Sequence, residues 1–343
     1  MTLLEAAACP ISDYTRGSAT VALAARTDRV TREAQERAID SDELVVAPSL
    51  RAAIHALARG DLPLYGPALI ADDEEELAQQ LGPALGRRLL REKQIPPSDA
   101  LREVAEAIEG ALAGGRALTK DELHTELRSR VRGELLPWCR GCGNHHVAPM
   151  LWRFAGVKVG MRCDSQRRFR LGEMGSSRVA ADAARRFLRF YGPATSKEFG
   201  AWAGLARTHA RRLWTEIEEE LVEVEVDNRR PGLLLEDEPA LDSPPTAAGV
   251  RLLPPHDPYL QQYDRTTLAP DPDLRKRLFR PAASPGVVLQ NGRVAGLWRA
   301  RRRGSRTELE IEELERVDRD ELEAEARLVA EASGSRAAAV RWT

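Results

Sequence analysis

The hydrophobic and polar positions of the chain follow a helical period in two long runs, Ala100–Leu112 and Arg178–Phe190, which we predict to be helices. Each run is followed by a glycine-containing turn and then by a Thr-x-x-Glu sequence, Thr119–Glu122 in one case and Thr195–Glu198 in the other. In such a capping box the threonine hydroxyl accepts a hydrogen bond from the N3 amide, and the glutamate accepts one from the cap amide. Both sequences therefore predict the start of a second helix.

The same order of elements occurs twice, about 75 residues apart. In each copy a further helix and then an apolar, β-branched hairpin are expected after the capped helix. The predicted hairpins pair Val157–Cys163 with Arg168–Leu171, and Leu221–Val226 with Leu233–Leu235. Helix, turn, capped helix, further helix and hairpin is the order of a winged helix-turn-helix. The repeat therefore predicts tandem winged helices, which are typical of proteins that handle double-stranded nucleic acid.

The N-terminal region has weaker patterns. Thr31–Ile39 is predicted to be a short helix with its first residue as the cap, and Leu44–Leu50 has the pattern of a strand. Because Pro48 cannot donate a ladder hydrogen bond, we expect that strand at the edge of a sheet or in a wing. Asp61–Ala71 and Glu74–Arg91 are predicted to be helices.

After the Pro-containing segment Asp242–Pro245, which is typical of a linker, the pattern changes to that of strands. Strands are predicted at Val250–Leu253, Gly286–Gln290, Arg293–Arg301, Thr307–Glu313 and Ala338–Trp342. Asn291-Gly292 between two of them is a two-residue hairpin signal. Asp318 is expected to cap a helix that continues to Ala332.

These patterns predict a mainly α-helical protein with β wings. We expect three tandem winged helix-turn-helix units, at residues 1–95, 96–175 and 176–245, and a C-terminal β-rich, barrel-like domain at residues 246–343. A length of 343 residues agrees with about two to four compact units.

Composition limits the possible partners. Apolar residues make up 43% of the chain and charged residues 30%, the net charge is −2, and the isoelectric point is about 6.4. A nucleic-acid site must therefore be a local basic patch on a balanced protein. The sequence has no apolar run of about 18 residues and no signal-peptide layout, and its four cysteines are unevenly spaced. We expect a cytoplasmic monomer that does not enter a membrane.

Several segments resemble one known family. They are Arg51-Ala-Ala-Ile-His55, Leu252-Leu-Pro-Pro-His-Asp-Pro-Tyr-Leu260, Asp264-Arg265, Arg280-Pro281 and Val287–Arg299. Together they resemble the AlkZ-like family of winged-helix DNA glycosylases, over nearly the whole chain. The resemblance implies three tandem winged helices followed by a β-barrel-like domain. It also implies excision of alkylated or cross-linked bases from double-stranded DNA, without a cofactor.

In that family a Gln-Φ-Gln or Gln-Φ-Asp motif in the first unit places or activates water. Counting back from the Arg-Ala-Ala-Ile-His segment puts this motif at Cys9–Asp13, where Pro10 and Ser12 stand in place of the glutamines. Asp13 is the nearby group that can act as a base or stabilise a cationic sugar. The resemblance thus implies Asp13 and Ser12 as catalytic residues. It implies His55 either as a DNA contact or as a wall residue of the first unit.

Three groups of arginines are candidates for phosphate contacts. One lies on a predicted recognition helix and consists of Arg207, Arg211 and Arg212, unless they pair with Glu216–Glu220. A second lies on a predicted hairpin that could follow phosphates or enter a minor groove, unless Glu308–Glu315 neutralises it. It consists of Arg299, Arg301, Arg302 and Arg303. The third surrounds the second wing and consists of Arg162, Arg167, Arg168 and Arg170.

The sequence Cys139-Arg-Gly-Cys142-Gly-Asn-His145-His146 has the composition of a zinc site, which Cys163 could complete. The spacing between Cys142 and the histidines is short. A Gly-rich turn in which the cysteines are packing groups is therefore the preferred interpretation, and we predict no metal ligands.

The few large aromatic residues are expected in the core rather than against bases. This expectation covers Trp138, Trp152, Trp202 and Trp214, which fall at predicted helix positions. Asp257, which precedes a proline, is expected to cap a turn.

Two functions are favoured on the sequence, and a third, a zinc-stabilised interaction protein with no nucleic-acid role, rests on Cys139 and Cys142 alone and is the least favoured. The first is a duplex DNA-binding winged-helix protein that acts as a glycosylase on bulky N-alkylated or cross-linked bases. The alternative is a non-catalytic DNA-binding protein or transcription regulator that kept the scaffold and lost the glutamine motif.

Overall fold

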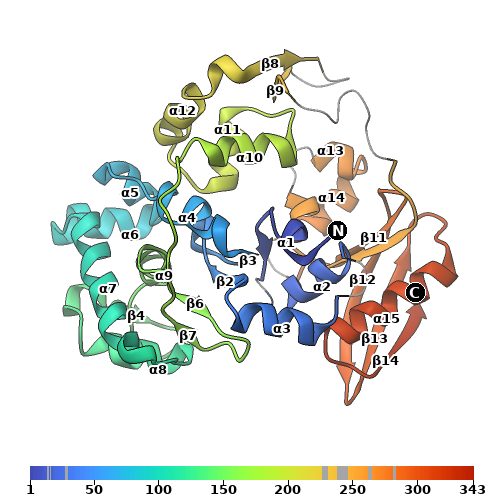
Figure 1. The fold of residues 1–343 in the computed structure, drawn as a ribbon, viewed down its shortest axis with the longest axis horizontal. Helices are drawn as coiled ribbons and strands as arrows, with labels where there is room; N and C mark the ends of the chain where they lie inside the picture. The colour runs from blue at the N-terminus through green and yellow to red at the C-terminus, as the bar shows by residue number, and fades with distance from the viewer. Residues whose placement is uncertain are drawn as a thin grey trace. The chain divides into compact units, whose positions relative to one another are not determined.

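The computed structural model describes residues 1–13, 15, 17–27, 30–225, 231–237, 246–261, 265–280 and 283–343 (Figure 1). The chain divides into two compact units: residues 1–38 with 239–343 form the first, and residues 39–238 form the second. The linker expected at Asp242–Pro245 lies outside the described residues, as do Val226, Asp264 and Pro281. The domain boundaries expected after residues 95, 175 and 245 stay predictions.

A five-stranded sheet makes up much of the first unit. Its strands in spatial order are β10 (Val250–Leu253), β11 (Gly286–Gln290), β12 (Arg293–Arg303), β13 (Arg306–Glu313) and β14 (Ala337–Trp342). Neighbouring strands are antiparallel except β13 and β14, which are parallel. All five predicted strands are confirmed. The Asn291-Gly292 turn is confirmed as well, with the positive φ angles of 50° and 76° that a two-residue hairpin needs.

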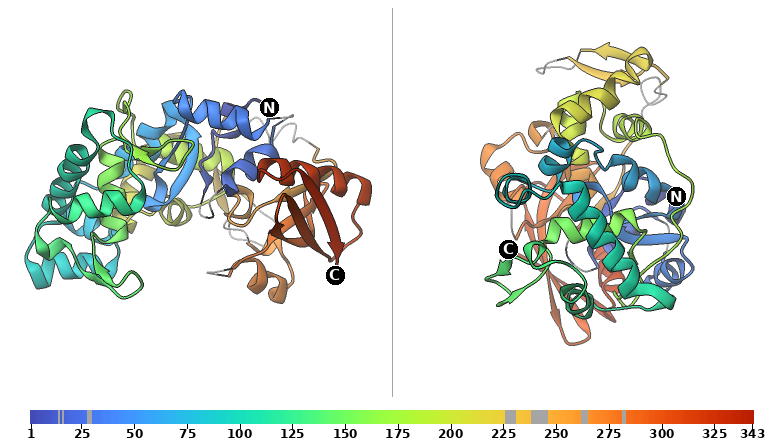
Figure 2. Two further views of the ribbon diagram at one scale, coloured as in Figure 1. Left: turned by 90° about the horizontal axis from the view of Figure 1, so that it is seen from below. Right: turned by 90° about the vertical axis from the view of Figure 1, so that its left-hand side faces the viewer.

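The predicted barrel is wrong. Among the strands that the structure describes, β10 and β14 are the two edges of this sheet, and they do not pair. Strand β14 lies parallel to β13, and parallel neighbours need a crossover connection, which here is helix α15 (Arg319–Ala332). This helix lies across one face of the sheet (Figure 2). A helix therefore covers the apolar face that a closed barrel would have enclosed.

The predicted cap of α15 is confirmed. The carboxylate of Asp318 accepts hydrogen bonds from the amides of Asp320 and Glu321, at 3.1 and 3.0 Å. The buried face of α15 packs on the sheet and on helix α2 (Ser18–Ala24), in a core that includes Val21, Trp298 and Leu322. The N-terminal helix α2 therefore belongs to the same compact unit as the C-terminal sheet.

The opposite face of the sheet is covered near β10 and β11 by two short helices, α13 (Arg265–Leu268) and α14 (Pro272–Leu278). Leu253, Val287 and Leu297 of the sheet and Leu278 of α14 share one buried cluster there. Residues 299–306, at the outer end of β12 and in the turn into β13, are exposed.

The second unit contains the two repeats. The first is formed by α7 (Pro97–Leu112), α8 (Lys120–Arg128), α9 (Pro149–Lys158), β6 (Arg162–Cys163) and β7 (Phe169–Arg170). The second is formed by α10 (Asp182–Tyr191), α11 (Ser196–Ala203), α12 (Arg207–Thr215), β8 (Leu221–Val224) and β9 (Gly232–Leu235). Three helices followed by an antiparallel hairpin is the order that the sequence predicted. The first hairpin is shorter than expected, because α9 continues to Lys158.

Both predicted capping boxes are present. The amides of Glu122 and Glu198 each donate to the threonine hydroxyl at 3.3 Å, and each glutamate accepts from the threonine amide at 2.8 Å. The residue before each threonine forms an isolated antiparallel bridge to the second hairpin strand: Leu118 to Phe169, and Ala194 to Leu233. The repeats thus share a three-stranded pairing as well as an order of helices.

Strand β2 (Leu44–Pro48) corrects a prediction. It lies between β3 (Ile54–Ala58) and β6 rather than at an edge, and all its residues are buried. Pro48 is tolerated because it ends the strand, whereas β6 meets β2 only where Val46 pairs with Cys163.

The two helices predicted over 61–71 and 74–91 are each interrupted in the structure. The expected helix over 61–71 is α4 (Leu62–Tyr65) and a 3-10 turn after Gly66. The expected helix over 74–91 is interrupted at Gly82, whose φ is 97°. It consists of α5 (Glu74–Gln80), α6 (Pro83–Arg87) and a π-helical continuation of α6, Arg88–Lys93. The N-terminal residues form α1 (Leu3–Ala6), β1 (Ile11–Ser12), α2 and α3 (Arg32–Asp40), and the Thr31 hydroxyl accepts from the Ala34 amide at 3.2 Å as predicted. Within the described parts of the chain, no helix has the length and hydrophobicity to cross a membrane.

Of the four tryptophans predicted to lie in the core, three are buried. Trp152, Trp202 and Trp214 are buried, but Trp138 is 57% exposed, so its prediction as a core residue is wrong. Trp138 lies in a small hairpin, β4 (Trp138–Cys139) and β5 (Asn144–His145), rather than on a helix.

Candidate functional site

Asp13 lies at the start of α2 and is buried. Its Oδ1 accepts hydrogen bonds from the amides of Gly17 and Ala19, both at 3.1 Å. These amides have no partner within the helix, and the positive end of the helix dipole favours an anion here. The left-handed φ of 87° at Gly17 turns the chain so that its amide faces Asp13. The carboxylate is therefore held in a fixed position.

Ser12 is buried beside it in β1, and its backbone carbonyl accepts a hydrogen bond from the hydroxyl of Ser18 at 3.1 Å. The two residues implied as catalytic are thus tied to the first turn of one helix. A fixed carboxylate suits electrostatic stabilisation of a nearby cation, since no reorganisation is needed when the charge develops.

His55 is buried, with 2% of its surface exposed, and it therefore reaches no solvent-facing phosphate in this structure. Its Nδ1 lies 2.8 Å from the hydroxyl of Ser49 and 3.1 Å from the carbonyl of Ala53. Burial, and then the nearby charge of Arg51, lower the pKa of His55 to about 3. A neutral, enclosed imidazole favours the wall residue of the two expected roles, and a DNA contact by His55 stays a prediction.

Arg51, which opens the family-like segment, also has a structural partner. Its guanidinium donates to the carbonyl of Trp202 at 2.8 Å. The Arg51–His55 segment therefore connects buried parts of the second unit.

On α12, the three candidate arginines are all exposed but differ in their partners. Arg212 forms a two-armed pair with Glu76 of α5, at 3.1 and 2.9 Å, and the Thr208 hydroxyl donates to the same carboxylate at 2.6 Å. These bonds lower the pKa of Glu76 to about 2, the Arg212 bond having the largest effect. The guanidinium groups of Arg207 and Arg211 make no hydrogen bond or ion pair with any described residue, although the backbone carbonyl of Arg211 accepts from the Thr215 hydroxyl at 3.1 Å. The expected pairing with Glu216–Glu220 is not what holds Arg212.

The arginines of β12 face the glutamates of β13. Residue pairing aligns Arg299 with Glu310 and Arg301 with Glu308 across the two strands. The ion pairs formed are diagonal: Arg301 with Glu310 at 3.8 Å and Arg303 with Glu308 at 2.8 Å. The neutralisation that the sequence left open is therefore present in part.

The two other arginines of this hairpin bond to carbonyls. Arg299 donates to the carbonyl of Ala283 at 3.0 Å, and Arg302 to those of Gly304 and Gly334 at 3.2 and 3.4 Å. The side chains of Arg301 and Arg303 are 64% and 69% exposed, so phosphates can reach them.

The third arginine group is largely used within the fold. Arg162 is fully buried and pairs with Asp42 at 3.3 Å, and Arg170 pairs with the same carboxylate at 2.7 Å. Arg168 is exposed but pairs with Asp164 at 3.3 Å. Arg168 is therefore the exposed member of this group, with 51% of its side chain accessible, whereas Arg167 is half-buried.

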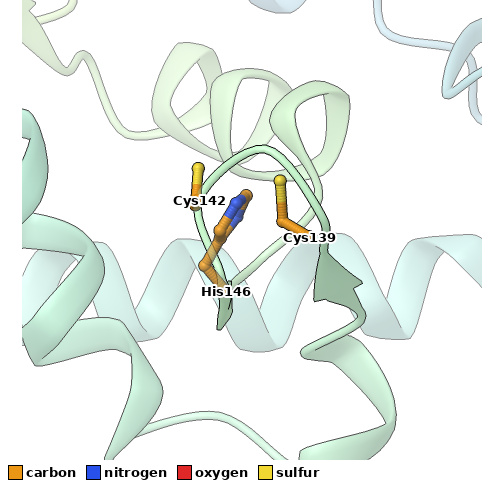
Figure 3. A group of neighbouring side chains, drawn as sticks. All are labelled: Cys139, Cys142 and His146. Atoms are coloured by element: carbon orange, nitrogen blue, oxygen red, sulfur yellow. The ribbon is translucent and has the colours of Figure 1, made fainter.

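Part of the cysteine and histidine sequence converges. The ligand atoms of Cys139, Cys142 and His146 all lie within 4.8 Å of one another (Figure 3). His145 points elsewhere: its Nδ1 lies 2.8 Å from the carbonyl of Leu136, and its ring is stacked edge-on against Trp138. Cys163 is buried in β6 and is not a member of this group.

Some partners had no signal in the sequence. Asp257 caps a turn as expected, accepting from the Tyr259 amide at 2.9 Å, but it is also buried against the guanidinium of Arg26 at 2.5 and 2.8 Å. Glu76 and Arg212 lie 136 residues apart. No local pattern joins either pair.

Known proteins resemble this chain in sequence and in fold. The family model described as "DNA glycosylase AlkZ-like" matches residues 12–332. An interstrand DNA cross-link repair glycosylase of Streptomyces sahachiroi is 28% identical over 314 residues, which cover 84% of this chain and 79% of that protein. The structure of Streptomyces sahachiroi DNA glycosylase AlkZ matches with a TM-score of 0.73 at 24% identity, over 98% of this chain and 92% of that one. At that identity the structural match shows the fold alone.

Proposed function

The chain belongs to the AlkZ-like family of DNA glycosylases, and we propose that it excises bulky N-alkylated or cross-linked bases from double-stranded DNA. The relative from Streptomyces sahachiroi is named for repair of interstrand cross-links, which supports this substrate class. The position of Asp13 carries the catalytic part of the proposal, because its carboxylate is held by two backbone amides at 3.1 Å.

The chemistry needs little from the protein. An N-alkylated purine nucleotide has a cationic leaving group, so the N-glycosidic bond breaks with its electrons returning to the base. Water forms the new bond at C1′ and loses a proton as it does so. A fixed carboxylate stabilises the positive charge that develops on the sugar and can accept the water proton. Asp13 takes this role, and Ser12 provides a neighbouring hydrogen-bonding group.

We also propose that the two repeats bind DNA as winged helices. Their helix order, their capping boxes and the paired bridges from Leu118 and Ala194 support this assignment. In this arrangement α12 is a recognition helix that carries Arg207 and Arg211, and the β12–β13 hairpin follows the phosphates with Arg301, Arg302 and Arg303. Arg168, in the β6–β7 hairpin of the first repeat, adds a further phosphate contact.

The test is excision from a duplex that contains N7-alkylguanine, read as abasic sites. Asp13→Asn keeps an oxygen that can accept from both amides but removes the charge. We expect it to lower excision by about 10²–10⁴ while leaving DNA binding unchanged. Asp318→Asn is the matched control, because Asp318 also accepts from two amides at a helix start in the same unit. Equal excision by Asp13→Asn and wild type would remove Asp13 from the mechanism.

One observation favours a second function. Pro10 and Ser12 replace the glutamines of the family motif, and the cap of α2 is by itself a structural role for Asp13. A non-catalytic DNA-binding protein would show salt-sensitive duplex binding without excision. Absence of abasic sites on all N3- and N7-alkylated duplexes, with binding intact, would establish that alternative.

A further inference from the structure

The first repeat contains an insertion that the second lacks. In the second repeat α11 ends at Ala203 and α12 begins at Arg207, whereas in the first α8 ends at Arg128 and α9 begins at Pro149. The insertion includes the β4–β5 hairpin, whose strands have two residues each. A connection of this length is unusual in a compact fold unless something holds it in place.

Apolar burial does not hold the tip of this insertion. Every residue from 136 to 146 is exposed or only half-buried, and Trp138 is 57% exposed. A two-stranded hairpin without a buried face is marginally stable in water. Small structures of this kind are commonly stabilised by a disulfide or a structural metal.

The side chains that converge here, two cysteines and a histidine, are of the types that bind zinc in proteins. We propose that Cys139, Cys142 and His146 bind a structural Zn²⁺ ion that fastens the hairpin to the start of α9. Figure 3 shows the two sulfur atoms on either side of the loop and the imidazole of His146 between them. Tetrahedral coordination with Zn–S of about 2.3 Å and Zn–N of about 2.0 Å places ligand atoms about 3.5–3.8 Å apart. Their present separations, within 4.8 Å, need only small adjustments of the loop.

The backbone of this loop has room to make such an adjustment at Gly143. Gly143 has a φ of 60° and open space around its Cα, and its amide donates to the carbonyl of Cys139 at 2.9 Å. That bond closes the turn between the two cysteines and points both sulfurs to one side. On binding, the two thiols lose their protons to solvent as the Zn–S bonds form, and no electrons are transferred.

The orientation of His146 is the second observation that points to a ligand. Its Nδ1 lies 2.8 Å from the carbonyl of Val147, whereas its Nε2 is buried and has no hydrogen-bond partner among the described residues. An Nδ1–H bonded to a carbonyl leaves the Nε2 lone pair free, which is the usual state of a zinc-binding histidine. An unpartnered buried nitrogen is otherwise costly.

His124 of α8 is the fourth ligand in this proposal. Its ring centroid is 5.0 Å from that of His146, and its Nδ1 is also buried without a partner in the described structure. Movement of this ring toward the two sulfur atoms would complete a Cys₂His₂ set and join the hairpin to α8. The ion would then connect both helices that flank the insertion.

The test is the metal content of the full-length chain, purified without chelators and measured by mass spectrometry. We expect one Zn²⁺ per chain, lost in Cys142→Ser and His146→Ala. His145→Ala is the matched control, because this adjacent histidine points away, and it should keep its zinc. In the cobalt-substituted protein, thiolate-to-metal charge-transfer bands should vanish in Cys142→Ser, and His124→Ala should alter the ligand-field bands and weaken binding.

A structural readout separates zinc binding from adventitious metal. Arg140 is exposed between the two cysteines, so trypsin should cut there slowly in the zinc-loaded chain and quickly after chelation. Equal metal content in His145→Ala and His146→Ala would overturn the proposal, as would a Cys139–Cys142 disulfide in the native protein. An unchanged cobalt spectrum in His124→Ala would overturn the assignment of the fourth ligand.

Discussion

The arginines of α12 and those of the β12–β13 hairpin look alike in sequence, but in the structure they differ in their ion-pair partners. On α12, Arg207 and Arg211 have no partner among the described residues, whereas Arg212 is held by Glu76 and, through that carboxylate, by Thr208. On the hairpin, the basic strand lies next to an acidic one, and Arg301 and Arg303 each face a glutamate.

The difference follows from secondary structure. Residues four apart on a helix share a face, so Arg207 and Arg211 point outward together. In an antiparallel pair, alternate residues of neighbouring strands share a face, so the alternating arginines of β12 meet the alternating glutamates of β13. Basic charge on a helix can therefore remain unpaired, while basic charge on a hairpin depends on the next strand.

Arginine content is thus a poor measure of positive surface. An exposed pair such as Arg303 with Glu308 contributes about 0–1 kcal/mol, so a phosphate can replace the glutamate. The two-armed pair of Arg212 with the buried Glu76 is harder to replace. We therefore expect DNA to recruit the hairpin arginines and the two free arginines of α12, but not Arg212.

Changing Arg301, Arg302 and Arg303 together to alanine is expected to have the largest effect on DNA binding. Each phosphate contact that is lost lowers the slope of log K against log salt by roughly 0.9, so three lost contacts lower it by about 2.7. Anisotropy titrations of a labelled duplex at several salt concentrations measure this slope. A matched control removes the same charge at three other exposed positions of the first unit, Arg293, Arg316 and Arg327.

The control should change the slope little. An equal change in both triple variants would mean that net charge, rather than the hairpin, determines binding. A hairpin variant with wild-type affinity and slope would show that the glutamates of β13 keep their arginines in the complex.

Changing Arg207 and Arg211 together to alanine is expected to lower the slope by about 1.8, because two contacts are lost. The control changes Arg87 and Arg91, which are also exposed, four residues apart and in the second unit. If the two double variants behaved alike, α12 would not be the recognition helix.

Glu76→Gln is expected to have a smaller effect and of opposite sign. Without the carboxylate charge Arg212 is released, and one added phosphate contact should raise the slope by about 0.9 and tighten binding. Glu75→Gln removes the same charge from an exposed neighbouring position and should leave the slope unchanged. Weaker binding of Glu76→Gln than of wild type would show that the pair positions α12 rather than withholding Arg212.

The features that the sequence predicted correctly are caps, turns and strands that depend on neighbouring residues. The capping boxes at Thr119 and Thr195, the Asn291-Gly292 turn and the cap at Asp318 all depend on residues within a few positions of one another. The C-terminal strands were predictable for the same reason, since alternation is read within one segment.

What the sequence missed depends on distant partners. Pro48 indicated an edge strand because nothing local shows that β6, more than 100 residues later, lies beside β2. Arg162 was wrongly predicted to be part of a surface patch, because Asp42 holds that arginine in the interior. The barrel was overpredicted because strand patterns do not reveal that a helix crossover covers the sheet.

The candidate site shows the same division. Cys139 and Cys142 are close because of the turn between them, which the sequence contains. His146 joins them because it directly follows β5, the strand that pairs with Trp138 and Cys139. His124 lies on a separate helix, and no spacing rule would have included it. Likewise, Asp13 was found through family resemblance, but the sequence did not show that it caps α2.

The smallest expected effect concerns stability in acid, and it tests how firmly Arg212 is held. The pKa of Glu76 is lowered from 4.5 to about 2, first by its bonds to Arg212 and then by the Thr208 hydroxyl. A lowered folded-state pKa means that the unfolded chain binds the proton more readily. The stabilising contribution is therefore complete above the ordinary pKa and is lost as pH falls toward about 2.

We expect wild type to be more stable than Glu76→Gln in urea at about pH 6, with the difference shrinking at about pH 3. Glu75→Gln should show no such pH-dependent difference from wild type. An equal difference in stability between wild type and Glu76→Gln at both pH values would mean that the carboxylate is not the group that holds Arg212. The contrast between Arg212 and the unpaired Arg207 and Arg211 on α12 would then need another cause.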